Sequence, residues 1–525
     1  NYIKAIHKDI DIKEKRIQTG DIGNTIYDTV SAIDFKSNNL TLESLYDILW
    51  QIIQISGKGA VERKNNLVFS VIKQMSPLEA KYFVRIICGE LRFGINAKTL
   101  LDTFSYMMSG DKSLRKELDR AYGVCTDIGY ICKCIKDSNK ENVLTNIQNI
   151  HLTPGVPVLA RLVERVGSFD EVFQRFSMPI LVQPKFDGLR CQIHKYKIEN
   201  KPADFANMLW KKYTEKEVVS APTSLFAPVQ DNDDVEVRLF TRNLEDVTDM
   251  FPEIVQSAKN IKEESFVLDS EALGFNGDKF LSFQETMQRR RKTNVSSKQK
   301  EIPMKAMTFD ILYLNGKELI KEETENRINI LSNLHIKEKN IQQCTTDKVE
   351  DMDGLMDIFN QNVDAGNEGI IVKQCNGEYC PGDRNYQWIK LKKSMLNSLV
   401  DTVDLVCIGY YYGSGRRADL GIGAVLGAVY NDKTNTYEGI CKVGTGLTDD
   451  LMHRMLEDFS KDTLKEKPAN VLVEDSLAPD VWVFPRIVFT VEADDITKRI
   501  SSNNNIGGGL SLRFPRLVEW GRDKA

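Results

Sequence analysis

The stretch Gln183-Pro-Lys-Phe-Asp-Gly-Leu-Arg-Cys-Gln-Ile-His194 decides how the rest of the chain is interpreted. It follows the apolar run Met178-Pro-Ile-Leu-Val182, which is typical of a buried strand. Lys185 therefore lies at a strand end, where burying its ammonium costs free energy unless a partner or a reaction uses the charge. Asp187-Gly188 predicts a tight turn that returns the chain into a second strand beginning near Arg190. We expect Lys185 and Arg190 to lie at one mouth, although a surface lysine before a hairpin would give the same pattern.

Charged residues recur at the edges of other expected strands. Lys390 and Lys392 alternate with apolar residues, so both should face one side of a strand while Ile389 and Leu391 face the core. The other charged residues in such positions are Glu271, Asp310, Glu368 and Lys373. Because this arrangement is costly, its repetition predicts one shared cleft for a polyphosphate and a metal ion. A lysine at such a site can act as a nucleophile when it is neutral.

The composition is that of an ordinary globular protein. The chain has 525 residues, 42% hydrophobic and 28% charged, which suggests about three domains. The net charge of −5 does not by itself indicate a nucleic-acid binder, but phosphate binding needs only local positive charge. Local basic clusters occur at 289–292, 390–393 and 513–524. Each could also be a solvated surface, and the first could be a nuclear signal or a phosphate-facing loop.

No apolar run is long enough to cross a membrane, and residues 1–20 lack the apolar core of a signal peptide. The chain starts at Asn1, so we expect the natural N-terminus to lie upstream. The ten cysteines show no zinc spacing, and we interpret them as reduced thiols. These features predict a cytoplasmic protein, or a nuclear one if the source is eukaryotic.

The pattern of hydrophobic residues divides the chain into three domains. Residues 1–155 are expected to be helical, with Thr41, Ser76 and Asn96 as helix N-caps and a capping box between Ser76 and Glu79. Residues 156–393 mix strands with helices and predict an α+β domain. Residues 394–525 contain short strands separated by Gly-rich turns, which predicts a Greek-key barrel such as an OB-fold. The polar residues 197–234 are expected to form a long loop or insertion.

Six ordered motifs make the chain resemble the ATP-dependent DNA ligases of the nucleotidyltransferase superfamily. The motifs of the central domain are Lys185-Phe-Asp-Gly-Leu-Arg190, Phe240-Thr-Arg-Asn243, Leu268-Asp-Ser-Glu271, Phe309-Asp-Ile-Leu-Tyr-Leu-Asn-Gly316, Glu368-Gly-Ile-Ile-Val-Lys373 and Trp388-Ile-Lys-Leu-Lys392. Gly444-Thr-Gly446 and Leu510-Ser-Leu-Arg-Phe-Pro-Arg516 match the final domain. Ser76-Pro-Leu-Glu-Ala80 and Gly89-Glu-Leu-Arg-Phe-Gly94 resemble the helical DNA-binding domain of the replicative archaeal-eukaryotic type.

The resemblance implies an enzyme that seals nicks in duplex DNA during replication, repair and recombination. Lys185 would attack ATP and carry AMP, which then passes to the 5′-phosphate before the 3′-hydroxyl displaces it. Phe309 would stack on adenine, and Glu271 and Glu368 would bind Mg²⁺. The residues expected to bind the nucleotide are Gln183, Arg190, Arg242, Glu271, Phe309, Lys373, Arg384, Lys390, Lys392, Arg513 and Arg516. Arg513 and Arg516 would act only in the first step, brought in by movement of the barrel.

Two departures from the family pattern stand out. Gln183 occupies a position where the family usually has Glu, which contacts the adenine amine; an amide oxygen can accept the same hydrogen bond. Residues 197–234 are longer than the hairpin usual at that place, and we have no functional account of them.

Other enzymes with lysine nucleotidyl chemistry are alternatives. RNA ligases and mRNA-capping guanylyltransferases generally lack a helical domain like 1–155. An NAD-dependent ligase would carry a four-cysteine zinc site and helix-hairpin-helix repeats, which are not apparent. A catalytically silent DNA clamp would not need Lys185, Glu271 and Glu368. The expected partner is nicked duplex DNA bound by a monomer; no clear sliding-clamp peptide is visible, so further partners stay open.

Overall fold

The computed structural model describes residues 12–31, 40–55, 57–197, 234–277, 279–290, 295–393, 402–493, 495–498 and 506–522. The chain divides into two compact units, one of residues 1–94 with 399–525 and one of residues 95–398. The division falls inside the helical domain expected over 1–155, and the three-domain boundaries stay a prediction. Apart from Lys197 and Asp234, the segment 197–234 lies outside the described residues.

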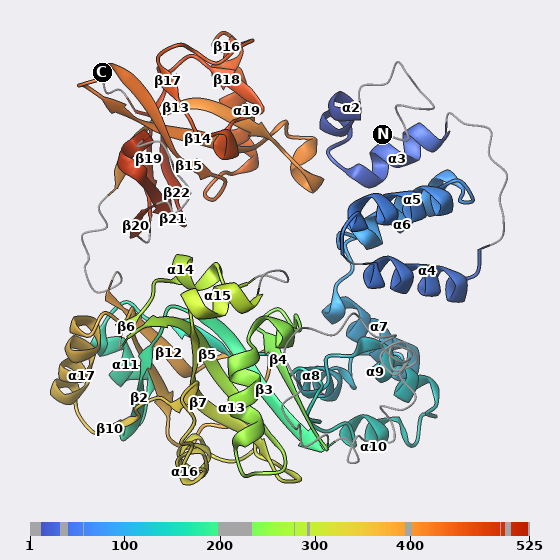
Figure 1. The fold of residues 1–525 in the computed structure, drawn as a ribbon, viewed down its shortest axis with the longest axis vertical. Helices are drawn as coiled ribbons and strands as arrows, with labels where there is room; N and C mark the ends of the chain where they lie inside the picture. The colour runs from blue at the N-terminus through green and yellow to red at the C-terminus, as the bar shows by residue number, and fades with distance from the viewer. Residues whose placement is uncertain are drawn as a thin grey trace. The chain divides into compact units, whose positions relative to one another are not determined.

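The first unit begins with short amphipathic helices. They are α2 (Ile12–Thr19), α3 (Ile22–Ser31), α4 (Leu42–Gln54), α5 (Ala60–Ile72) and α6 (Pro77–Ile87) (Figure 1). The sequence predicted the starts of α4 and α6 correctly: the Thr41 side chain accepts a hydrogen bond from the Ser44 N–H, and Ser76 forms a complete capping box with Glu79. A core that includes Ile52 and Phe83 holds α3 to α6 together.

The C-terminal part of the first unit is a strongly curled antiparallel sheet. Five strands follow one another around it in the order β22 (Arg516–Arg522), β19 (Val488–Glu492), β13 (Val403–Tyr412), β14 (Ile422–Asn431) and β15 (Thr436–Val443). A bridge between Thr445 and Arg516 joins the β15 end back to β22, so the sheet closes as expected for a small barrel. The other described elements of this part are β16 (Thr463–Leu464), β17 (Val471–Leu472), β18 (Val481–Val483), β20 (Asp495–Lys498), β21 (Leu510–Arg513), α19 (Asp449–Phe459), η4 (Gly415–Ala418), η5 (Asp475–Leu477) and η6 (Ile506–Gly509).

The second unit starts with four helices that belong to its main core. They are α7 (Ala97–Ser109), α8 (Arg115–Val124), α9 (Ile128–Lys136) and α10 (Val143–Gln148). Asn96 caps α7 as predicted, accepting from the Thr99 N–H. Buried residues of these helices, such as Leu118 and Ile131, share one hydrophobic cluster with Val267 and Leu312 from the strands beyond. The helices therefore brace the α+β part of this unit.

Two sheets form the rest of the second unit (Figure 1). The five-stranded sheet has the order β1 (Leu162–Arg165), β12 (Arg384–Lys392), β11 (Gly369–Gln374), β2 (Ile180–Lys185), β10 (Asp347–Val349). The seven-stranded sheet has the path β4 (Val235–Thr241), β3 (Leu189–Lys197), β5 (Phe266–Asn276), β7 (Met304–Leu314), β8 (Lys317–Glu318), with β6 (Lys279–Phe280) on β5 and β9 (Ile341–Gln343) on β7.

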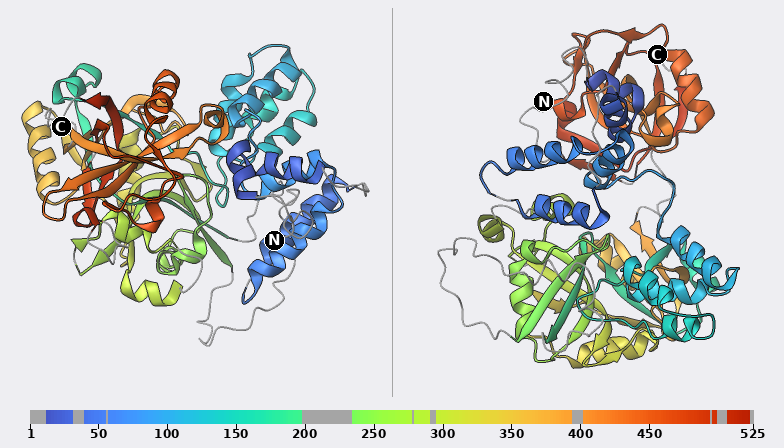
Figure 2. Two further views of the ribbon diagram at one scale, coloured as in Figure 1. Left: turned by 90° about the horizontal axis from the view of Figure 1, so that it is seen from above. Right: turned by 90° about the vertical axis from the view of Figure 1, so that its right-hand side faces the viewer.

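Helices cover one face of each sheet. On the five-stranded sheet, α11 (Phe169–Arg175) and α17 (Met352–Asp364) bury residues such as Phe359 against Val182 and Ile389. On the seven-stranded sheet, α13 (Pro252–Asn260) lies along the outer face with Ile254 in the core (Figure 2). The remaining described helices of this unit are η3 (Thr248–Met250), α14 (Phe283–Met287), α15 (Val295–Glu301) and α16 (Thr324–Asn333).

Candidate active site

A cavity of about 440 Å³ is lined by residues from both sheets of the second unit. It brings together nine of the residues predicted from the sequence: Gln183, Lys185, Arg190, Arg242, Glu271, Phe309, Lys373, Arg384 and Lys390. Glu368 and Lys392 join this group through the ion pairs described next. The remaining two, Arg513 and Arg516, end β21 and begin β22 in the first unit.

Lys185 is the last residue of β2 and pairs with the carboxylate of the residue just before the neighbouring strand β11. Its Nζ donates a hydrogen bond to Glu368 Oε2, and Lys392 Nζ lies 3.4 Å from the same oxygen. Gly369, next to Glu368, lets the backbones of β11 and β12 lie close together, because its φ of 144° is unusual for other residues and a Cβ there would lie 2.0 Å from the Leu391 carbonyl oxygen. Glu368 therefore serves the lysine, and Gly369 serves the backbone.

The segment Phe186–Gly188 differs from the predicted hairpin turn. β2 pairs with β10 and β11, whereas β3 pairs with β4 and β5, so these residues carry the chain from one sheet to the other. A Cβ on Gly188 would lie 2.6 Å from the Ala272 carbonyl oxygen and 3.0 Å from Glu271 Cγ. The short crossing explains how Lys185 and Arg190 line one cavity although they belong to different sheets.

The five-stranded wall of the cavity is crowded with cations. Ile389 and Leu391 are fully buried while Lys390 and Lys392 are half-buried, which confirms the predicted alternation along β12. Burial, together with the positive charges of Arg165, Lys185, Lys392 and Arg384, lowers the pKa of Lys390 to about 8. A wall of this kind favours an anionic ligand.

Arg190, on the opposite wall, is already paired. It donates from Nε to Asp269 Oδ1 at 3.0 Å and from Nη2 to Asp269 Oδ2, and Nη1 donates to the Arg161 carbonyl oxygen at 3.0 Å. The buried Tyr379 hydroxyl accepts from Arg190 Nη2 and donates to Asp269 Oδ2 at 2.8 Å. Burial alone would lower the pKa of Arg190, but Asp269 raises it above its usual value. The guanidinium thus stays charged and fixed beneath the Phe309 ring, 5.3 Å from the ring centroid.

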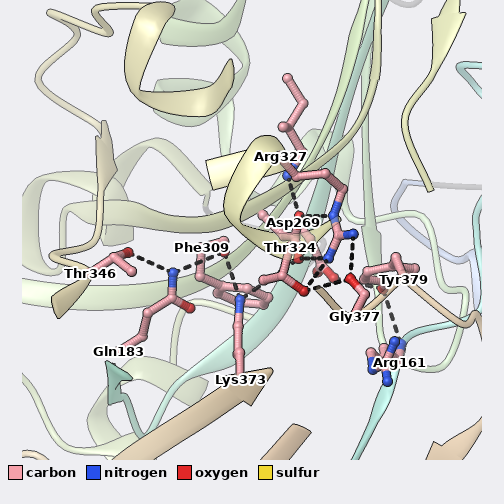
Figure 3. A network of polar contacts seen from close by, with 12 residues as sticks. Arg161, Gln183, Asp269, Phe309, Thr324, Arg327, Thr346, Lys373, Gly377 and Tyr379 are labelled. Atoms are coloured by element: carbon pink, nitrogen blue, oxygen red, sulfur yellow. Dashed lines mark hydrogen bonds and ion pairs between the residues drawn. The ribbon is translucent and has the colours of Figure 1, made fainter. Parts of the chain in front are cut away.

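Phe309 sits at a β-bulge. Asp269 of β5 pairs with Asp310 and Ser270 pairs with Thr308, so Phe309 has no partner in the register. A bulge re-aims one side chain and frees its backbone groups from the ladder. The Phe309 carbonyl oxygen accepts hydrogen bonds from Gln183 Nε2 at 3.2 Å and from Lys373 Nζ at 2.9 Å (Figure 3). Two side chains of the five-stranded sheet therefore hold the bulge of the other sheet in place.

Glu271 is a carboxylate whose pKa is raised by this environment. Burial raises its pKa to about 7, although Arg190 and Lys185 oppose the shift. Within the described part of the chain, no group of three or more His, Cys, Asp or Glu side chains could hold a metal ion. Two carboxylates nevertheless fit Mg²⁺, which usually takes one or two carboxylates and completes its octahedron with water and substrate phosphates.

Arg289, at the start of the basic run 289–292, does not belong to a phosphate-facing loop. Arg289 is 1% exposed, and its Nη2 donates to both Glu253 oxygens, at 2.8 and 3.0 Å. Arg290 pairs with Glu245. Arg289 is therefore a core residue; positions 291 and 292 lie outside the described residues.

Several residues of the site were missed by the sequence analysis. Arg161 lines the cavity with its guanidinium 5.2 Å from the Trp388 ring centroid, and burial lowers its pKa. Asp269 and Tyr379 hold Arg190, and Thr346 accepts from Gln183 Nε2 at 2.9 Å. Asp269 lies inside the quoted Leu268–Glu271 motif and could have been noticed there. Arg161 and Tyr379 carry no local signal, since they meet across 218 positions.

Family models match three successive parts of the chain. The DNA ligase N terminus matches residues 1–105, the ATP dependent DNA ligase domain matches 227–392, and the ATP dependent DNA ligase C terminal region matches 418–524. A DNA ligase 1 of Methanosarcina acetivorans is 32% identical over 530 residues, covering 98% of this chain and 83% of the relative. The chain belongs to the ATP-dependent DNA ligase family. A DNA ligase of Thermoplasma volcanium is also 32% identical, over 98% of this chain and 82% of its own length.

A solved structure named Pmar-Lig_Pre shares the fold of the whole chain. Its TM-score is 0.55 at 15% identity, with 99% of this chain and 94% of that chain covered. The family resemblance inferred from the motifs is therefore confirmed, as is the succession of a helical, an adenylation and a strand-rich C-terminal region. The ligase-domain match begins at residue 227, within the polar segment 197–234, so Lys185 lies upstream of it. Sealing nicks through an adenylate intermediate with ATP is the general function of this family, and DNA is its substrate. Among the described residues, none of the helices combines the length and apolar character that crossing a membrane requires.

Proposed function

We propose that Lys185 is the nucleophile of this ligase. Its Nζ, once deprotonated, forms a P–N bond with the α-phosphorus of ATP as the bond to pyrophosphate breaks. The AMP then passes to the 5′-phosphate of a nick, and the 3′-hydroxyl forms the phosphodiester as AMP leaves. The observation that carries this assignment is the position of Lys185 at a strand end, in a cavity shared with Glu271, Phe309 and Lys390.

Adenine is held by Phe309 and Gln183 in this proposal. The Phe309 ring supplies a stacking face. The Gln183 Nε2 group is committed to the Phe309 carbonyl oxygen and to Thr346, which leaves Oε1 as an acceptor for the exocyclic amine of adenine. Glutamine can therefore replace the usual glutamate because only the acceptor oxygen is needed by the base.

The cations divide between ribose and phosphates. Arg190 spends most of its N–H groups on Asp269, Arg161 and Tyr379, so it offers little more than one Nη1 hydrogen to a ligand. Arg242 and Arg384 are exposed at the cavity and are better placed to reach ribose and phosphate oxygens. Lys373, Lys390 and Lys392 would neutralise charge on the phosphates. Arg513 and Arg516 would orient pyrophosphate in the first step.

Glu271 and Glu368 would hold Mg²⁺, which stabilises negative charge on the phosphate oxygens when bound. Residues 1–155 would bind nicked duplex DNA as a domain, residues 156–393 would carry adenylation and residues 394–525 would form the mobile barrel, within a monomer.

Self-adenylation tests the nucleophile directly. Incubation with magnesium and ATP labelled in the α-phosphate should give a covalent AMP adduct, located by mass spectrometry on Lys185. Lys185→Ala should give none, whereas Lys197→Ala, a lysine outside the cavity that pairs with Glu264, should adenylate normally. An adduct on another residue, or an undiminished adduct in Lys185→Ala, would contradict the assignment.

A further inference from the structure

Beside the nucleotide cavity lies a buried ion pair that no step above uses. Asp310 and Arg327 both have fully buried side chains. Arg327 donates from Nε to Asp310 Oδ1 at 2.8 Å and from Nη2 to Oδ2 at 3.1 Å. Such a pair is costly to desolvate and often adds little to stability, so its presence needs another reason.

Arg327 ties three segments to this carboxylate. It belongs to α16, and its Nη1 donates to the carbonyl oxygens of Glu322, at 2.5 Å, and of Gly377, at 3.3 Å. Gly377 lies in the connection between β11 and β12, the strands that carry Lys373 and Lys390. Figure 3 shows Arg327 reaching from its helix toward Thr324, Gly377 and the strand residues around Phe309. The pair therefore fixes the loop behind the phosphate-facing strands to β7.

Lys373 lies next to the pair and lines the cavity. Its side chain is 1% exposed, and its Nζ lies 3.7 Å from Asp310 Oδ2 and 3.9 Å from the Trp388 ring centroid. Among the described residues, Asp310 is the carboxylate that forms an ion pair with Lys373. The same Nζ donates to the Phe309 carbonyl oxygen. One ammonium thus touches the bulge that holds Phe309, the aromatic wall and the buried pair.

We propose that Asp310, held by Arg327, is a positioning residue for nucleotidyl transfer: its carboxylate keeps Lys373 cationic and holds the ammonium at the cavity wall beside Phe309. This inference rests on the proposed function, since it assumes that Lys373 acts on the phosphates. Asp310 does not reach the cavity itself and acts through Lys373.

The electrostatics of Lys373 support this role. Burial lowers the pKa of Lys373 to about 8, and Asp310 opposes that shift. The other charged or titratable groups that face it are Cys344, Arg327 and Asp269. Burial raises the pKa of Cys344 to about 12, so this thiol stays neutral, and Arg327 disfavours the ammonium. Without the Asp310 charge, Lys373 would lose its proton at a lower pH.

Removing both charges of the pair distinguishes a role in positioning Lys373 from a purely structural role. Asp310→Asn alone leaves Arg327 buried without a counter-charge and should unfold more easily, so the informative variant is Asp310→Asn with Arg327→Met. A buried pair replaced by neutral side chains of similar size is expected to fold. The matched control is Glu253→Gln with Arg289→Met, which removes another buried pair of this unit, away from the cavity.

Single-turnover self-adenylation, measured from about pH 6.5 to pH 9, gives the readout. The Asp310/Arg327 double variant should be folded yet adenylate about 10- to 100-fold more slowly near pH 8, with a smaller deficit at the acid end, because its alkaline decline moves to lower pH. Because Lys390 is unchanged in every variant, a shift in the pH of the alkaline decline reports on Lys373. The Glu253/Arg289 variant should keep the wild-type rate and profile.

A double variant that folds and matches wild type at every pH would overturn the inference and leave the pair a purely structural one. If the double variant does not fold, Asp310→Asn, with rates normalised to folded protein by circular dichroism at each pH, must still show the shifted decline; an unshifted decline overturns the proposal. Failure of the proposed function would look different, because wild type itself would then form no adduct on Lys185.

Discussion

The two walls of the nucleotide cavity handle charge in opposite ways. On the seven-stranded sheet, Arg190 is neutralised by Asp269 and fixed by Tyr379. On the five-stranded sheet, Lys185 and Lys392 share one carboxylate, Glu368, while burial and cationic neighbours lower the pKa of Lys390. On the first wall the arginine is fixed by its own ion pair, and the second wall gathers several cations around one carboxylate. In the proposed function, the first wall would present Phe309 to the base and the second would receive the phosphates.

The largest effect is expected when the ion pair between Asp269 and Arg190 on the seven-stranded sheet is broken. Asp269→Asn leaves Arg190, whose side chain is only 14% exposed, without its counter-charge, so the free energy of unfolding should fall by about 3–5 kcal/mol. Urea unfolding measures this. Asp246→Asn is the control, because its pair with Arg238 is exposed and should contribute less than about 1 kcal/mol. Equal losses in the two variants would mean that the two pairs do not differ as described.

An intermediate effect is expected at the ring. Phe309→Leu keeps an apolar side chain at the bulge but removes the stacking face, which should weaken ATP binding by about 1–3 kcal/mol. Isothermal titration or the KM for ATP in self-adenylation measures the change. Phe173→Leu, in the separate core under α11, serves as the matched control and should leave ATP affinity unaltered. If affinity is unchanged in Phe309→Leu as well, the base does not stack there.

The smallest effect is expected at Lys390, on the wall formed by the five-stranded sheet. The pKa of Lys390 is about 8 in the folded protein and about 10.5 for an ordinary lysine, so its charge is a penalty to folding below pH 8 that fades as the pH rises toward 10.5. Lys390→Met should therefore raise the Tm at pH 7, by about 2–4 °C, and the gain should shrink steadily above pH 8.

At pH 7, added pyrophosphate should reverse the order of the two Tm values, because it neutralises the cations of the wild-type wall and meets one cation fewer in Lys390→Met. Thermal unfolding with and without pyrophosphate measures both effects. A lower Tm for Lys390→Met than for wild type at pH 7 would contradict the prediction that the Lys390 charge destabilises the folded protein. An equal effect of pyrophosphate on the two Tm values would contradict it as well.

The elements that follow local rules were predictable from the sequence. The caps at Thr41 and Ser76 and the alternation along β12 are confirmed. They could be predicted because cap hydrogen bonds within four residues and the two-residue period of a strand depend only on the local sequence. The gathering of most motif residues of the central domain into one cavity was also predicted, because charged residues recur along its expected strands.

The remaining features depend on contacts distant in sequence. The crossing at Phe186–Gly188 was misread as a hairpin, because a tight turn does not reveal which sheet the next strand joins. Arg289 was placed on a surface since a basic run has no signal for its partner Glu253, 36 positions away. The support of Arg190 by Tyr379 and of Lys373 by Asp310 and Arg327 appears only when the two sheets face each other.

The bulge in β7 makes this site sensitive to the length of the chain. Phe309 faces the cavity because β7 carries one residue more than β5 between Thr308 and Asp310. A single deletion there would restore a regular ladder and bring a different side chain to the aromatic position, even if every other motif stayed intact. Libraries that sample substitutions alone would not reveal this constraint, and aligned relatives with a gap beside this phenylalanine should be treated as altered in base recognition.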